Sequence, residues 1–204
     1  MQDLTPQMLL TAYAYGYFPM AEHQDDPNLY WFSPDPRGTL PLERFNIPRG
    51  LARFMKSHPF TLKINSDFAG VIAGCAEINA RRKETWINAH ILELYIALHN
   101  MGHAHSIETW RDGKLVGGLY GVSLGGAFFG ESMFSREPEA SKTALVTLVD
   151  ALKAAGYSLL DTQYVNPHLV QFGVESTPRR TYLRRLEKAL TLTPSPLLLP
   201  QANP

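Results

Sequence analysis

The sequence has little of what would place it in several familiar classes of protein. Cys75 is its single cysteine, so no internal disulfide can form, as suits a reducing compartment. No segment approaches the roughly 20 apolar residues of a membrane-spanning helix, and the initial MQDLTPQMLL lacks the basic start of a secretory signal. We therefore expect a soluble, cytoplasmic protein with no membrane partner.

Net charge is also absent, because 19 Lys and Arg balance 19 Asp and Glu. This balance argues against a general binder of polyanions. The positive charge is nevertheless clustered: Arg49, Arg53 and Lys56 share one face of a predicted helix over 49–58, and further clusters fall at 81–83 and 179–185. Local clusters of this kind favour contact with a defined stretch of nucleic-acid backbone, although a solvated helix face is an equal alternative.

The length of 204 residues allows one ordinary domain with a small appendage. The apolar fraction of 45% is enough to fill a core. The proline-rich stretch over 18–48, which contains YWFSPDPR, disfavours regular helix. We predict a small N-terminal subdomain over 1–40 and a larger domain over 41–204, in a monomeric protein.

Local signals predict the secondary structure of the first half. Thr5 and Pro6 form a cap and first turn for a helix that Gly16 ends. Beyond the proline-rich stretch we expect the 49–58 helix, a strand over 60–64, a helix capped by Ser66 that runs to about Ile78, and a helix over 89–101.

The second half has a sharper pattern. Asp-Gly and Gly-Gly turns separate strands over 103–110, 114–123 and 127–133, which predicts an antiparallel meander. A helix over 139–155, which Gly156 closes, then connects to a strand over 157–163. This strand should run parallel to 127–133 because a helical crossover joins them. Shorter helices are expected over 167–172 and 178–190.

This order of elements is that of acetyltransferase-like (GNAT-like) folds. Such folds are α+β, with a mixed sheet, flanking helices, and parallel strands that splay to hold an acyl donor. The glycine-rich loop that binds acetyl-CoA would fall at Ser135–Ser141, where this chain reads SREPEAS. Without glycines the backbone cannot wrap a pyrophosphate closely. We therefore expect an acyltransferase scaffold that uses a different donor.

Three polar side chains lie in otherwise apolar predicted strands: Glu131, Asp161 and Gln163. Burying a carboxylate is costly unless it is paired or used in chemistry. Asp161 and Gln163 are two residues apart, so in a regular strand both would point to the same face. A buried Glu131 that merely pairs with a basic side chain is the structural alternative.

Other reactive residues give weaker signals. His103 and His105 share a strand face, but no third ligand is evident, so we expect neither a metal nor another cofactor. Cys75 lies among small apolar residues and is expected in the core. A catalytic triad could be assembled from Ser132, His168 and Asp161, but no GxSxG elbow accompanies it.

Taken in order, the motifs of the chain resemble those of leucyl/phenylalanyl-tRNA–protein transferases. They are AYxxGxFPM (12–20), WFSPDPR (31–37), TWI (85–87), GHAHSIExW, LVGGLYGV, GESMFS, SKTAL and LDTQ, and they span nearly the whole chain. The resemblance implies transfer of leucine or phenylalanine from aminoacyl-tRNA to proteins that begin with Lys or Arg, which marks them for degradation by the N-end rule. It also implies a GNAT-like larger domain. Unlike longer members, this sequence begins almost at its first helix and has Met20 where others can carry Trp.

The resemblance also implies roles for individual residues. Glu131 would fix the α-amino group of the donor, Asp161 would accept or relay a proton, and Gln163 would orient the attacking amine. The basic Lys or Arg of the acceptor would need an anionic partner, for which Glu108 joins Glu131 and Asp161. The expected substrate pocket comprises Trp86, Leu119, Phe128, Ser132 and Met133, and the expected tRNA contacts are Arg49, Arg53 and Lys56.

No activated nucleophile is visible, so we expect direct attack of the amine on the aminoacyl ester without an acyl-enzyme. Two other classes stay open. One is an N-acetyltransferase-like enzyme with a small acyl donor. The other is a non-catalytic protein that binds the end of tRNA, which would need the basic clusters but not Asp161 and Gln163.

Overall fold

The computed structural model of the chain describes residues 4–57, 60–79 and 83–199. Its helices are α1 (Pro6–Ala14), α2 (Arg49–Ser57), α3 (Phe68–Ala76), α4 (Ala89–Asn100), α5 (Ala140–Ala155), α6 (Pro167–Val170) and α7 (Arg179–Leu190), with a 3-10 turn, η1, over Leu42–Arg44. Its strands are β1 (Phe18–Met20), β2 (Tyr30–Phe32), β3 (Arg37–Thr39), β4 (Thr61–Ile64), β5 (Ala104–Arg111), β6 (Lys114–Leu124), β7 (Ala127–Ser135), β8 (Leu159–Gln163) and β9 (Glu175–Thr177).

Within these described ranges the strands form a large mixed sheet in the order β4-β5-β6-β7-β8-β3-β9, and β1 pairs separately with β2. The β5-β6-β7 meander is antiparallel, and β8 runs parallel to β7 after the α5 crossover. Both features confirm the topology predicted for the second half. The mixed α+β class is therefore confirmed, whereas the GNAT-like assignment and the division at residue 40 stay predictions.

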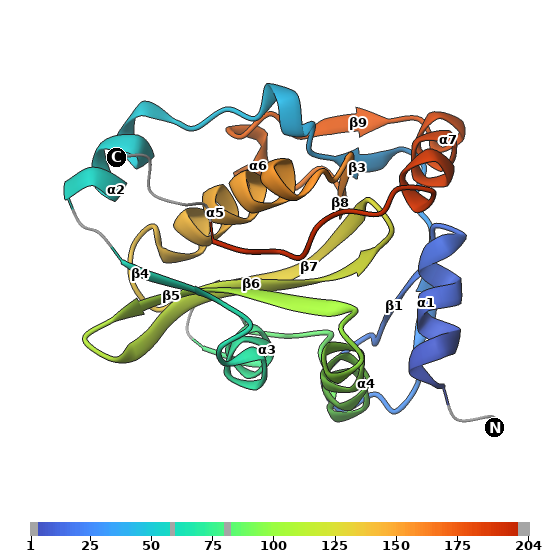
Figure 1. The fold of residues 1–204 in the computed structure, drawn as a ribbon. Coiled ribbons are helices and arrows are strands. Elements are labelled where there is room, and N and C mark those ends of the chain that lie inside the picture. Colours follow the sequence, from blue (N-terminus) through green and yellow to red (C-terminus); the bar gives the residue numbers. More distant parts are fainter. Residues whose placement is uncertain (1–3, 58–59, 80–82, 200–204) are drawn as a thin grey trace.

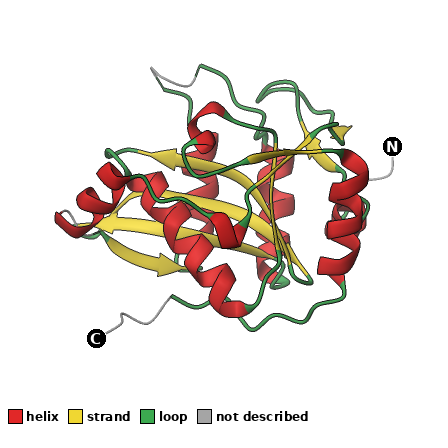
Figure 2. Ribbon diagram, turned by 90° about the horizontal axis from the view of Figure 1, so that it is seen from above, coloured by secondary structure: helices red, strands yellow, loops and turns green. Residues whose placement is uncertain are grey.

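Helices cover both faces of the sheet (Figure 1). α5 lies on one face, α3 and α4 lie on the other, and α1 and α7 stand at one end. The view from above shows the strands twisting relative to one another beneath the helices (Figure 2). The two faces carry separate buried clusters: Tyr120 and Phe129 belong to the α3/α4 side, and Leu119 and Phe128 to the α5 side.

Helix ends follow the sequence signals with one exception. The Thr5 hydroxyl accepts a hydrogen bond from the Met8 N–H, and Gly156 ends α5 with a φ of 88°, as predicted. The prediction of Ser66 as a cap is wrong, because α3 is capped by Asp67, whose Oδ1 accepts from the Gly70 N–H. The Ser66 N–H instead donates to Glu108. The predicted end of the 49–58 helix at residue 58 lies outside the described residues.

β7 and β8 stay together for only a short distance. They pair from Ala127 opposite Leu159 to Phe129 opposite Asp161. Beyond this point β7 continues to Ser135 alongside β6, while β8 continues to Gln163 alongside β3. The strands are thus drawn toward different neighbours, and the sheet opens between them.

A β-bulge lies on each strand at this opening. Tyr120 of β6 pairs with Ser132 and Gly121 pairs with Gly130, so Glu131 is an extra residue on β7. Gly38 pairs with Gln163 and Thr39 with Asp161, so Thr162 is an extra residue on β8. A bulge bends its strand and re-aims the side chains around it. The two bulges therefore determine which side chains face the opening.

Glycine at position 38 permits this arrangement of β8. A Cβ atom there would lie 2.3 Å from the backbone C and O of Tyr164, the residue that follows β8. Such a short distance is a steric clash that backbone atoms cannot relieve by moving. β3 can therefore approach the bulged end of β8 only at a residue without a side chain.

Arg37 of β3 holds the same end of the sheet together. It is fully buried, and its Nε and Nη2 donate to both oxygens of Asp161 at 2.8–3.2 Å. Its Nη1 donates to the Gly16 carbonyl, just beyond α1. The guanidinium lies between the rings of Phe18 and Tyr182, at 4.8 and 4.6 Å from their centroids. One side chain thus joins β3, β8, α7 and the end of α1.

No helix in residues 4–57, 60–79 and 83–199 is both long enough and apolar enough to cross a membrane.

Removing Arg37 should cost far more stability than removing an exposed arginine. Arg37→Met leaves a fully buried carboxylate without its counter-charge, which typically costs about 3–5 kcal/mol of unfolding free energy. The control is Arg44→Met, because Arg44 pairs with Glu175 at the surface and such pairs contribute about 0–1 kcal/mol. Urea unfolding of both variants measures the difference. If both variants lose an equally small amount of unfolding free energy, the buried ion pair does not contribute much to stability.

Candidate active site

A cavity of about 300 Å³ occupies the opening between β7 and β8. This volume lies at the lower end of the range for ligand pockets, roughly 300–1,000 Å³. Several elements contribute to its lining, among them both faces of the sheet, β1, α5 and the β8–α6 segment. The lining residues are Phe18, Met20, Trp86, Leu119, Tyr120, Gly130, Glu131, Ser132, Met133, Leu145, Leu148, Leu160, Thr162, Gln163, Tyr164, Asn166, His168 and Leu169. Most of the wall is apolar, and polar groups are concentrated at the two bulges.

Glu131 is the acidic group of this wall. The Tyr13 hydroxyl donates to its Oε1 at 2.7 Å, and the Tyr95 hydroxyl donates to its Oε2 at 3.1 Å. Burial raises the pKa of Glu131 to about 7, although the two tyrosine hydrogen bonds act in the opposite direction. Near neutral pH the carboxyl group therefore exchanges readily between its neutral and ionised forms.

Gln163 faces Glu131 across the opening. Its backbone has a φ of 55°, in the left-handed region that few side-chain-bearing residues adopt. Its Nε2 donates to Glu131 Oε1 at 3.4 Å, and its backbone N–H donates to Asp161 Oδ1 at 2.8 Å. The amide side chain thus reaches the cavity while the backbone is tied to the core.

Asp161 is placed differently from the expectation that it shares a site with Gln163. It is fully buried and absent from the described cavity lining. Its oxygens accept from Arg37, from the Tyr182 hydroxyl at 2.6 Å, and from the Gln163 N–H. The two-residue alternation fails because Thr162 is a bulge residue and Gln163 is left-handed. Asp161 therefore reaches the cavity only through the backbone of Gln163.

The structure brings four of the five expected pocket residues into the cavity wall, namely Trp86, Leu119, Ser132 and Met133. Phe128 is not among the described lining residues. Its ring is fully buried in the α5-side cluster, where it meets Tyr157 edge to face at 6.5 Å. Phe128 is thus placed as a core residue behind the wall rather than as part of it.

Glu108 cannot serve as a partner for a basic acceptor. It is fully buried, and its two oxygens accept from the Ser66 and Asp67 N–H groups, the Ser106 hydroxyl and the Trp110 indole. These four donors occupy the hydrogen-bonding capacity of the carboxylate. Their contacts hold the start of α3 against β5. The expectation that Glu108 contacts substrate is therefore wrong.

Cys75 is buried in the core, as predicted. Burial lowers the pKa of His105 to about 4, so its imidazole is neutral at physiological pH. His103 lies close to the Ser123 carbonyl. Within the described residues no group of three or more His, Cys, Asp or Glu side chains is arranged to hold a metal ion.

A serine triad of Ser132, His168 and Asp161, which the missing GxSxG elbow argued against, does not assemble. Ser132 and His168 line the cavity, but the carboxylate of Asp161 is bound to Arg37 in the core.

Sequence reasoning missed the residues that hold the site. Tyr13 and Tyr95 orient Glu131, and Arg37 and Tyr182 hold Asp161. These partners are separated from the carboxylates by 21 to 124 positions, so no local pattern could pair them. Two of the four had a signal in the motifs: Tyr13 lies in AYxxGxFPM, and Arg37 ends WFSPDPR. Tyr95 and Tyr182 lie in none of the motifs.

The predicted basic helix is present as α2, and Arg49, Arg53 and Lys56 are all exposed on it. Within the second predicted cluster, Arg81 and Arg82 lie outside the described residues. The third cluster lies on α7, where Arg180, Arg184 and Arg185 are exposed.

Comparison with known proteins identifies close relatives. A family model described as leucyl/phenylalanyl-tRNA protein transferase matches residues 39–187, and the model of the N-terminal domain of that family matches residues 2–35. A leucyl/phenylalanyl-tRNA–protein transferase of Rhodopseudomonas palustris (strain HaA2) is 56% identical over 92% of this chain and 84% of its own length. The protein of the same name from Ruegeria sp. (strain TM1040) is 54% identical over 92% of this chain and 87% of its own length.

Among solved structures, L-PGS from Bacillus licheniformis aligns with 86% of this chain and 60% of its own chain, with a TM-score of 0.41 and 12% identity. This similarity is too low to support an argument about the fold.

The raised pKa of Glu131 predicts a pH-dependent contribution to stability. A folded pKa near 7 against about 4.3 in unfolded chains means that the folded state binds more protons between these values. The contribution of Glu131 is therefore fully present below about pH 4 and is lost as the pH rises through 7. In urea unfolding, the stability of wild type relative to Glu131→Gln should fall from pH 5 to pH 8. If the difference in unfolding free energy between wild type and Glu131→Gln does not change with pH, the pKa of Glu131 is not raised.

Proposed function

The chain belongs to the leucyl/phenylalanyl-tRNA protein transferase family, and we propose that it transfers leucine or phenylalanine from aminoacyl-tRNA to the amino terminus of proteins that begin with Lys or Arg. Such transfer would mark the acceptor for degradation by the N-end rule. The observation that carries the proposal is the largely apolar cavity between β7 and β8, with Glu131 and Gln163 together on its polar side.

The cavity suits the aminoacyl end of the donor. Its apolar wall, which includes Leu119, Met133 and Leu145, can bury the side chain of leucine or phenylalanine. Apolar walls discriminate weakly between similar apolar side chains, at about 1–3 kcal/mol per methylene, which fits acceptance of both amino acids. Met20 and Trp86 also line the cavity, and a thioether beside an indole offers a surface for the terminal adenosine.

In the proposed scheme Glu131 holds the α-amino group of the donor. An ionised carboxylate is an acceptor for an ammonium group, and the Tyr13 and Tyr95 hydroxyls fix its orientation. Burial raises the pKa of both hydroxyls, so they remain protonated donors. The donor amine thereby has one well-defined partner in the wall.

In the proposed scheme Gln163 orients the attacking amine. The N-terminal nitrogen of the acceptor attacks the ester carbonyl, the new C–N bond forms, and the C–O bond to the ribose breaks. The ribose oxygen takes the proton that the attacking amine loses and leaves as a hydroxyl. An aminoacyl ester is already activated, so alignment beside the amine supplies most of what the reaction requires. No covalent acyl-enzyme is part of this scheme.

Asp161 acts in this scheme through Gln163 rather than on the amine itself. Its carboxylate is saturated by Arg37, the Tyr182 hydroxyl and the Gln163 N–H. It therefore fixes the left-handed backbone of Gln163 and so the direction of the amide side chain.

We also propose that the larger sheet is GNAT-like, because β7 and β8 diverge at the cavity. The exposed side chains of α2, namely Arg49, Arg53 and Lys56, would contact the phosphates of the tRNA.

Transfer of radiolabelled leucine tests the proposed function. The purified protein should move leucine from Leu-tRNA to a peptide that begins with Arg, and it should not accept an acetyl group from acetyl-CoA. An otherwise identical peptide that begins with Asp is the matched acceptor control. Acetyl transfer would support the small-donor acetyltransferase, and binding of Leu-tRNA without any transfer would support a non-catalytic protein.

A polar group in the apolar wall should impair both donors. Leu119→Asp places an unpaired charge against the side chain of the donor, at a cost of about 1–3 kcal/mol or more, so transfer of Leu and Phe should fall by at least about fivefold. The control is Leu119→Met, which nearly conserves volume and apolar character. Rates are compared for Leu, Phe and a misacylated polar residue on one tRNA. If the transfer rate is the same for all three amino acids on this tRNA, the apolar wall does not bind the side chain of the donor.

A further inference from the structure

Half of the arginines in the described parts of the chain have a partner, and the other half do not. Arg37, Arg44, Arg111 and Arg136 each form an ion pair with a carboxylate. Arg179 donates to the Ser33 carbonyl and the Tyr17 hydroxyl. The described arginines without an ion pair or a side-chain hydrogen bond lie on two helices, α2 and α7: Arg49, Arg53, Arg180, Arg184 and Arg185. Among the described arginines, those without a partner are thus confined to two helices, on a protein whose net charge is zero.

On α7 the charges are arranged on the exposed side of an anchored helix. Tyr182, Leu186 and Ala189 are buried and fix the helix against the sheet. Arg180 and Arg184 are four residues apart and therefore share a face. Two like charges at this spacing destabilise a helix, so helix stability does not explain their presence.

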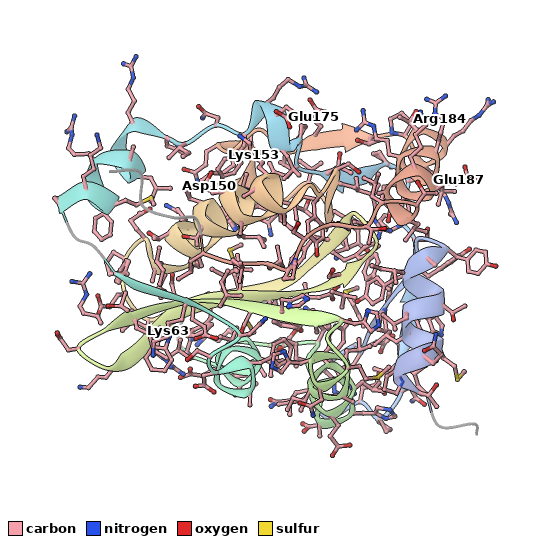
Figure 3. All side chains as sticks on the ribbon, viewed as in Figure 1. Lys63, Asp150, Lys153, Glu175, Arg184 and Glu187 are labelled. Carbon is pink, nitrogen blue, oxygen red and sulfur yellow. The ribbon has the colours of Figure 1, made fainter. Side chains whose placement is uncertain are left out.

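This face borders a hollow between α7 and α1. The hollow is lined by Ala14, Tyr15, Arg180, Leu183, Arg184, Glu187 and Leu190. Tyr15 is 69% exposed, so its ring is open to solvent. Two guanidinium groups beside an exposed aromatic ring provide phosphate contacts and a stacking surface, the combination found where proteins bind nucleic-acid strands. Figure 3 shows Arg184 and Glu187 at the outer edge of the molecule, away from Asp150 and Lys153 of α5.

The position of α7 relative to α2 fits one large polyanion. In Figure 1, α2 and α7 stand at opposite ends of the molecule with α6 between them, and α6 contributes His168 and Leu169 to the cavity. A donor whose 3′ end enters the cavity would have a backbone that extends past one or both helices. An acidic protein segment would match the charge but would make no use of the exposed ring of Tyr15.

We propose that the α7 face formed by Tyr15, Arg180, Arg184 and Arg185 is a second binding surface for the phosphate backbone of aminoacyl-tRNA, separate from α2 and from the cavity. This inference rests on the proposed function, because it takes aminoacyl-tRNA as the donor. The surface contributes affinity for the body of the tRNA and has no part in the chemistry at the ester. Its contribution is therefore electrostatic, sensitive to salt, and similar for leucine and phenylalanine tRNAs.

The test compares Arg180→Gln/Arg184→Gln with a matched variant that also loses two exposed charges, Lys114→Gln/Lys153→Gln. Wild type is first shown to transfer leucine, which tests the proposed function by itself. The dissociation constant for Leu-tRNA is then measured from low to high salt. Each phosphate contact contributes about 0.7–0.9 to the slope of log K against log salt, so the α7 variant should lower that slope by about 1.5 and the lysine variant should leave it unchanged.

A second readout separates this surface from the active site. Transfer from a leucyl-adenosine donor, which has no tRNA body, should be the same in wild type and the α7 variant. Arg184→Gln alone should lower the salt slope by about half as much, which keeps the test available if the double variant folds poorly. If the salt slope is unchanged in both the Arg180→Gln/Arg184→Gln variant and the Arg184→Gln variant, the proposal is overturned. It is also overturned if tRNA binding is unaffected while transfer to a folded protein falls relative to a dipeptide, since α7 would then contact the acceptor.

Discussion

The buried ion pair between Arg37 and Asp161 is the contact on which the site depends. Removing two charges from water is costly, and here the cost is offset by three N–H···O contacts, two flanking aromatic rings and the Tyr182 hydroxyl. The pair fixes β3 against β8 and so directs β8 away from β7. Gln163 is the third residue that donates to Asp161, and its N–H carries this order to the cavity wall.

The two carboxylates near the opening therefore have different environments. Asp161 is matched by a cation and lies behind the wall. Glu131 has tyrosine hydroxyls as donors, and burial raises its pKa. Asp161 adds to this rise by repulsion, and Arg37 opposes it. The protein thus keeps one carboxylate as a fixed structural charge and leaves the other able to change its charge near neutral pH.

Much of the fold could be predicted from the sequence because its signals are local. The turns of the meander, Gly156 and the α5 crossover gave the correct order and direction of β5 to β8. Glu131 and Gln163 stood out as polar residues in apolar strands. The relation between Asp161 and Gln163 could not be predicted, because strand alternation holds only without a bulge, and the bulge at Thr162 forms where β3, distant in sequence, pairs with β8. Phe128 was expected in the pocket because the sequence alone does not show which residues of β7 face the cavity.

The same long-range contacts have a consequence for how the protein is made. Tyr13 meets Glu131 across 118 positions, Arg37 meets Asp161 across 124, and Tyr182 joins them from α7. Contacts of such sequence separation form slowly, because the loop must close before the interaction stabilises it. A ribosome must also release α7 before the cluster is complete. The cavity therefore becomes organised only when nearly the whole chain has emerged, so a truncated nascent chain would have the strands of this enzyme without its site.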